Sequence, residues 1–107
     1  MDEFVAQLSL IGTEADGKEI CIDIKIGMPY ISETKEFGET WTCPLTMPPH
    51  INKIRGIHGS DSMQALCMAK SIAFDLLQNF VEKGGKLTHS GGHEFQLKNY
   101  GFNRAST

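Results

Sequence analysis

The side chains of this sequence that could bind a metal ion include four histidines and three cysteines. His89 and His93 flank a glycine turn and would point to the same side of a hairpin, with Glu94 beside them. A zinc site would need at least one or two further ligands, and the candidates are His50, His58 and Cys43. None of these residues has the HxH, HExxH or CxxC spacing that marks metal sites. We therefore expect no metal ion and no cofactor, and keep a ligand site at the His89/His93 hairpin as an alternative.

Catalysis by a nucleophile would require a cysteine or serine beside a base and an orienting group. Cys43 and Cys67 fall at positions expected in the core, where a thiol is normally inert. Ser60 and Ser62 lie at a predicted helix start, where capping accounts for them. The acidic residues of the predicted strands are not paired around an expected pocket. The sequence therefore predicts that the protein is not an enzyme.

One long helix, predicted over residues 61–83, organises the chain. Ser60 or Asp61 is expected to cap its first turn, and Gln64, three residues after Asp61, suits a capping box. Gly84 and Gly85 provide the left-handed conformation that commonly ends a helix. Apolar residues repeat at helical spacing and form one face, made by Ala65, Leu66, Ala69, Ala73, Leu76, Leu77 and Phe80.

The apolar arc of this helix is wider than a surface helix needs, because Met63, Cys67, Phe74 and Val81 extend it. A loop or the C-terminal hairpin of the same chain would cover the extra strip if those residues belong to the core. A partner or a second copy of the chain would cover it if they form an interface. Lys70 lies inside the arc and is expected to extend its ammonium group outward.

The remaining segments alternate apolar and polar residues as strands do. The clearest strand is 19–26, in which isoleucines occupy every second position, and 4–11 and 37–45 alternate less strictly. Trp41 and Cys43 should face the side of the sheet that the helix covers. Residues 27–36 are expected to form a connection, 52–58 are the weakest strand candidate, and 86–89 with 93–97 are expected to form a hairpin.

This order, β-β-β-α-β-β, predicts an α+β fold with a mainly antiparallel sheet of about four to six strands and one long helix packed across it. The 107 residues are enough for one domain, residues 1–107, with a core of its own. Its tail is expected to fray after about residue 102.

Composition and charge exclude several classes of protein. No apolar run approaches 18 residues and no signal peptide is apparent, so we expect no membrane span. The odd number of widely spaced cysteines is typical of a cytoplasmic protein with reduced thiols. A pI of about 5.7 without a basic, aromatic-containing stripe argues against nucleic-acid binding. Residues 1–51, however, hold three lysines against nine acids, and this half would complement a basic protein partner unless it is simply a solvated face.

The segments Trp41-Thr42-Cys43-Pro44 and GSDSMQAL, residues 59–66, form a recognisable pair. A W-x-C strand followed by a G-x-D-S-x-Q-A-L helix start resembles a family of small bacterial proteins of unknown function. The similarity would extend from Glu19 to Phe102, although its specific part is this pair of segments. The resemblance implies a compact α+β domain of bacterial origin and no established activity, so it assigns no catalytic residue.

We therefore expect a non-catalytic, intracellular protein-interaction module, of the immunity or antitoxin type that binds and blocks a bacterial toxin. Its partner would be that toxin or a second copy of the chain, and the residues expected to contact it are Asp16, Glu33, Glu36, Glu39, Met63 and Phe74. Two alternatives remain, a self-associating structural domain and a small-ligand or metal-binding domain at the His89/His93 hairpin.

Overall fold

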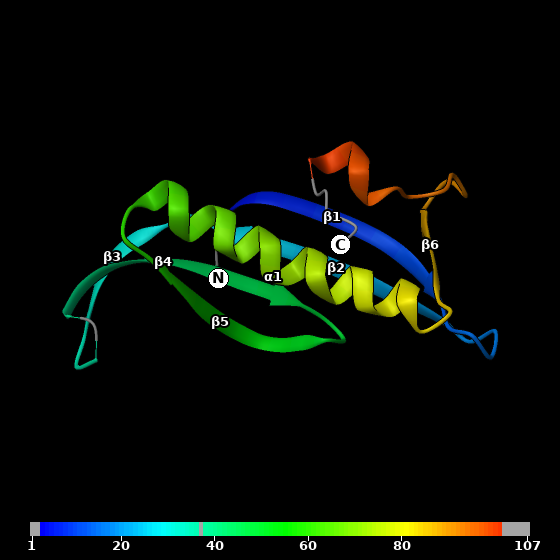
Figure 1. Cartoon of the computed structure of the whole chain (residues 1–107), viewed down its shortest axis with the longest axis horizontal. Coiled ribbons are helices and arrows are strands. Elements are labelled where there is room, and N and C mark those ends of the chain that lie inside the picture. Colours follow the sequence, from blue (N-terminus) through cyan, green and yellow to red (C-terminus); the bar gives the residue numbers. More distant parts are fainter. Residues whose placement is uncertain (1–2, 37, 102–107) are drawn as a thin grey trace.

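The computed structural model describes residues 3–36 and 38–101 and confirms the α+β fold (Figure 1). Six strands form an antiparallel sheet, and one long helix packs across it. The elements in order are β1 (Phe4–Thr13), β2 (Glu19–Gly27), β3 (Tyr30–Thr34), β4 (Gly38–Met47), β5 (Ile51–Gly59), α1 (Ser62–Glu82), β6 (Lys86–His89) and the 3₁₀ turn η1 (Leu97–Tyr100). Phe37 and the tail predicted to fray after residue 102 lie outside the described residues.

Strand β4 organises the sheet because three strands pair with it. β5 runs along one side, while β3 pairs with the first half of the other side and the end of β2 with the second half. β1 then pairs with β2 over its whole length and with β6 only from Leu10 to Thr13. Among the described strands, β5 forms one edge of the sheet, and β3, β6 and the first part of β1 lie at the other side with one neighbour each.

The core lies between one face of the sheet and α1, which packs mainly on β4 and β5. The alternating isoleucines of β2 face the helix, as do Cys43, Leu45 and Met47 of β4. Trp41 also packs against this core, which confirms its predicted orientation and that of Cys43. On the helix, Ala65, Ala69 and Ala73 are completely buried, because small side chains let the helix backbone approach the sheet closely.

Both predicted helix ends are confirmed, with one change at the start. The backbone N–H of Gln64 donates to Asp61 Oδ1 at 2.7 Å, which is the expected cap. The Gln64 side chain accepts from the backbone N–H and hydroxyl of Ser60, one residue before the cap. At the other end, Gly84 has a φ of 94°, a conformation that glycine adopts at little cost.

Two segments differ from the prediction because long-range pairing decides them. Residues 30–34 were expected to be part of a connection, but they form β3 because every residue from Tyr30 to Thr34 pairs with β4. The weakest strand candidate is the nine-residue β5. Five of its residues in a row are exposed at the sheet edge, so its sequence lacks the alternation of a half-buried strand.

The C-terminal segment forms only half of the predicted hairpin. β6 is a strand, but the returning chain at 93–97 makes a single bridge, Thr88 to Glu94. From there the chain crosses to the helix, where Phe95 and Tyr100 pack their rings against Phe74 at centroid distances of 6.3 and 5.9 Å. This segment therefore covers part of the wide apolar arc of α1, as one of the two interpretations of that arc expected.

Candidate interaction surface

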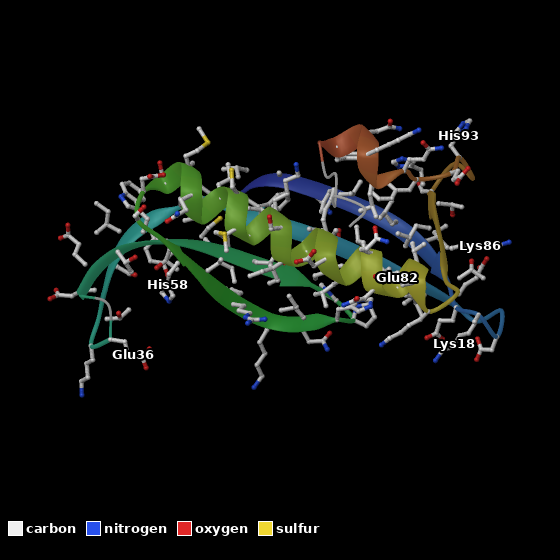
Figure 2. The ribbon with its side chains drawn as sticks, in the orientation of Figure 1. Lys18, Glu36, His58, Glu82, Lys86 and His93 are labelled. Atoms are coloured by element: carbon white, nitrogen blue, oxygen red, sulfur yellow. The ribbon has the colours of Figure 1, made fainter. Side chains whose placement is uncertain are left out.

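The histidines considered as candidate metal ligands are not brought together within the part of the chain that the structure describes. His89, on β6, lies opposite Leu10 of β1, and the centroid of its ring is 5.5 Å from that of Phe95. His93 is exposed in the following turn, and Figure 2 shows it far from His58 of β5. Within residues 3–36 and 38–101, no group of three or more histidine, cysteine, aspartate or glutamate residues could hold a metal ion.

A chain of hydrogen bonds joins Ser32, Thr42 and His58 across three strands. The Ser32 and Thr42 hydroxyls lie 2.6 Å apart, and Thr42 Oγ1 is 3.0 Å from His58 Nδ1. A serine, a threonine and an imidazole in contact resemble parts of a nucleophilic site. However, only 3 % of the surface of Thr42 is accessible, so a substrate could not reach the central hydroxyl. The arrangement satisfies a buried polar group and ties β3, β4 and β5 together.

The two cysteines expected in the core differ in environment. Cys43 is completely buried, and burial raises the pKa of its thiol, so it is an unreactive core residue. Cys67 is exposed, which corrects its predicted place in the core. The helix packs over β4 and β5 rather than over the middle of the sheet, so the side of α1 that carries Cys67 faces a groove beside β1.

The pKa values of two other groups, Asp23 and His50, are shifted by their surroundings. Asp23, on the sheet face opposite the helix, accepts hydrogen bonds from the side chains of Gln7 and Ser9, both at 2.9 Å, and lies 3.7 Å from Lys25 Nζ. The hydrogen bond from Gln7 has the largest effect and lowers the pKa of Asp23. Burial opposes it, and the smaller effects of the Ser9 bond and of Lys25 lower the pKa further. His50 lies in the turn between β4 and β5. Partial burial of its imidazole lowers the pKa of this group, and the nearby charge of Lys83 lowers it further.

The β3–β4 hairpin brings three of the predicted partner-binding residues together at its end. Glu33 on β3 pairs directly with Glu39 on β4, and Glu36 lies in the turn between them. The turn closes at Gly38, whose φ of 66° favours glycine. We call Glu33, Glu36 and Glu39 the acidic tip. All three are exposed, and none forms an ion pair with any residue that the structure describes.

An apolar row lies next to the acidic tip on the helix side of the sheet. Ile31 pairs with Trp41, which in turn pairs with Gly59, so these residues form the next row on the same face of the sheet as Glu33 and Glu39, two positions away along the strands. Ile31 is 54 % exposed. The first turn of α1 begins directly above this row and carries Met63, which is 68 % exposed. Figure 1 shows the start of α1, which carries Met63, at the same end of the molecule as β3.

The other two predicted contact residues lie elsewhere. Asp16 is in the β1–β2 turn, where it accepts a hydrogen bond from the backbone N–H of Lys18 at 2.9 Å. Figure 2 shows Lys18 and Glu36 at opposite ends of the molecule, so Asp16 cannot contribute to the tip. Phe74 is only 5 % exposed, beneath Phe95 and Tyr100. The structure therefore brings four of the six residues to one end of the sheet and separates two.

The groove beside β1 is a concavity with an almost wholly apolar lining. It has a volume of about 280 Å³, and its floor is formed by β1 and β2 and its wall by α1. Sequence analysis missed it, because it arises from the off-centre position of the helix. The one sequence signal that indicated it was the apolar arc of α1, which is wider than its contact with the sheet.

Comparisons of the chain with protein-family models, with curated proteins and with solved structures returned no match. The resemblance of residues 41–66 to a bacterial family thus stays a prediction. In the described part of the chain, no helix combines the length and the apolar character needed to cross a membrane.

Proposed function

We propose that this protein is a non-catalytic interaction module that binds a basic protein surface through the acidic tip. The observation that carries the proposal is the direct pairing of Glu33 with Glu39 in the β3–β4 register. Like charges at directly opposite positions of a sheet destabilise it. A residue pair that lowers the stability of the free protein is typical of a functional site, where a partner supplies the missing interaction.

A lysine or arginine of a partner would remove this repulsion. The free hairpin holds three carboxylates and has only Lys35 as a cation among its described residues. A partner cation placed between Glu33 and Glu39 would attract both carboxylates, and these two attractions would outweigh the repulsion between them. Exposed charges of this kind accelerate encounter with a partner of opposite sign and select against acidic partners.

The neighbouring apolar row supports a protein rather than a small cation as the partner. Protein interfaces combine a desolvated apolar centre with a polar rim. Ile31 is large and exposed beside the tip, and Met63 is exposed in the first turn of α1, so they would supply the centre while the glutamates form the rim. Trp41 is half-buried beside Ile31 on the neighbouring strand and would support that centre.

The more specific proposal is an immunity or antitoxin-type protein that blocks a bacterial toxin. Three features support it: the small size of the chain, the acidic first half, and the resemblance of residues 41–66 to a bacterial family. Inhibition would be steric and electrostatic, with the acidic tip covering a basic active-site cleft. No chemistry by this chain is required.

Charge reversal at the tip tests the proposal. The test variant is Glu33→Lys/Glu36→Lys/Glu39→Lys, and the matched control is Glu3→Lys/Glu19→Lys/Glu94→Lys, which makes the same change in net charge at exposed positions outside the tip. Each form is immobilised and exposed to an extract of the source organism. Wild type and control should retain the same basic protein in stoichiometric amount, and the tip variant should lose it.

A purified partner then gives the quantitative result. Isothermal titration should show that the tip variant binds at least about a hundredfold more weakly, because hot-spot contacts contribute about 2 kcal/mol or more each. Equal loss in both variants would mean that net charge alone governs binding. Retention by the tip variant would refute the tip as the binding site. Light scattering that detects a dimer sensitive only to the tip changes would identify the partner as a second copy.

A further inference from the structure

The groove between α1 and β1 forms a second concave surface, separate from the acidic tip. Its floor consists of helix-facing apolar residues of β1 and β2, such as Leu8 and Ile24, and its wall includes Leu66 and Phe74 of α1. Tyr100, at the end of η1, also lines it. Nearly all of its accessible lining is apolar. A groove of this kind would take up apolar side chains.

The floor of the groove is also a strand edge. β1 pairs with β2 from Phe4 onward, but its pairing with β6 begins only at Leu10. Among the described residues, no strand pairs with the outer edge of residues 4–9. Alternate backbone N–H and C=O groups of this segment therefore point outward and can pair with another strand. Ala6 and Leu8 of the same segment line the groove, so the edge and the groove are adjacent.

Lys70 supplies a single charge to this surface. It is the only charged residue among the described residues that line the groove. Its ammonium group donates to the backbone carbonyl of Tyr100 and lies 5.5 Å from the centroid of the Phe74 ring. An ammonium group has three N–H donors, so two remain for a ligand. Lys70 lies between Cys67 and Phe74 along the wall, near the middle of the groove rather than at one end.

We propose that this groove binds an extended peptide segment of a protein partner, which adds to the edge of β1 as a new strand. Side chains of alternate residues would enter the groove. The groove-facing positions of the segment would be apolar, acidic and apolar in turn, with the central carboxylate paired with Lys70. A side-chain carboxylate fits better than a terminal one because Lys70 lies midway along the wall.

The inference is independent of the acidic tip. The tip recognises positive charge at the far end of β3 and β4, whereas the groove recognises an apolar strand with one negative charge beside β1. Loss of one activity would leave the other unchanged, and the two experiments use different residues.

The test uses a seven-residue peptide, acetylated and amidated, with valine at positions two and six, glutamate at position four and threonine elsewhere. One control peptide has glutamine at position four. A second has proline at position three, which removes a backbone N–H and disfavours the strand. Binding to the full chain is followed by NMR titration of backbone amides. The glutamate peptide should bind about tenfold more tightly than the glutamine peptide, as expected for a charge-assisted hydrogen bond.

Two cysteines give an independent readout in the unmodified chain. Cys67 lines the groove and Cys21 lies on β2 outside it, and both are exposed. N-ethylmaleimide, a neutral thiol reagent, should label Cys67 several-fold more slowly in the presence of the peptide, as measured by peptide mass spectrometry. The labelling rate of Cys21 should not change. This readout requires no variant and so cannot be confused with misfolding.

The Lys70→Met variant keeps the length of the side chain and removes its charge, with Lys53→Met as the matched control on β5. Lys70→Met should bind the glutamate and glutamine peptides equally, while Lys53→Met keeps the tenfold preference. The inference is overturned if the glutamate peptide neither shifts groove amides nor protects Cys67 at millimolar concentration. It is also overturned if the proline peptide binds equally well, or if a dimer of the chain itself protects Cys67.

Discussion

Replacing Glu39 by lysine is expected to stabilise the protein, although it alters an exposed residue that makes no ion pair with the described chain. Glu33 and Glu39 are directly paired, so their charges lie roughly 6 Å apart. At that distance in water, two unit charges interact by about 0.7 kcal/mol, and reversing one of them changes the energy by about 1.4 kcal/mol. Salt at 0.1 M screens this to about 0.8 kcal/mol. The melting temperature should rise by about 3–6 °C.

Urea denaturation followed by the fluorescence of Trp41 measures this change, since Trp41 is the only tryptophan and lies two residues from position 39. Glu33→Lys should produce a similar gain. The double variant Glu33→Lys/Glu39→Lys restores two like charges and should return to a stability close to wild type. In 1 M salt, where the screening length is about 3 Å, the gains of both single variants should nearly disappear.

The control is Glu19→Lys, an identical charge change on an exposed strand position opposite Thr13. It should change the stability by less than about 0.5 kcal/mol. If Glu39→Lys gains no more than Glu19→Lys, the two tip glutamates do not repel each other. A double variant whose gain in stability equals the sum of the two single gains would lead to the same conclusion. Either result would remove the observation that supports the proposed partner site.

Three further predictions concern stability. The pKa of His50 is lowered in the folded protein from its ordinary value of 6.5. The contribution of neutral His50 to the free energy of unfolding is therefore present above pH 6.5 and is lost as the pH falls through the lower folded value. Urea titrations between pH 7.5 and 5 should show this loss of stability, and His50→Gln should make the loss smaller. Asp61→Ala should cost about 1 kcal/mol, because it removes the bond from the backbone N–H of Gln64. Gly59→Ala should cost about 1–3 kcal/mol, because the new Cβ would lie 2.5 Å from the backbone nitrogen of Ala65.

Simple controls accompany these three variants. His50→Gln should leave stability at pH 7.5 within about 0.5 kcal/mol of wild type, and an unchanged pH dependence would exclude His50 as its source. Asp61→Asn keeps a capping oxygen and should retain most of the stability that alanine loses. A Gly59→Ala variant as stable as wild type would contradict the close approach of β5 to the start of α1.

Local interactions made the helix and the best strand predictable from the sequence. The cap at Asp61 and the glycine at position 84 act on groups within one turn of the helix, so their effect is contained in a few adjacent residues. The isoleucines of β2 alternate because one face of that strand is buried. The three acidic residues were also visible in the sequence as part of a negatively charged half.

Non-local pairing decided what the sequence could not. Residues 30–34 form a strand because β4 pairs with them, and β5 is long because β4 supports it despite its exposed side chains. Cys67 has the helical spacing of a core residue but is exposed, because α1 packs off-centre on β4 and β5. Periodicity gives the faces of an element but not the position at which a neighbour covers them.

The amino-acid sequence by itself determined the α+β class, the ends of α1 and the sign of the charge on the first half of the chain. Each of these depends on composition or on contacts between residues close in sequence. Only the tertiary structure set Glu33 opposite Glu39, moved Asp16 to the other end of the molecule and left a groove beside the first residues of β1. Strand register and helix placement join residues distant in the chain, and the spacing of residues along the sequence does not specify them.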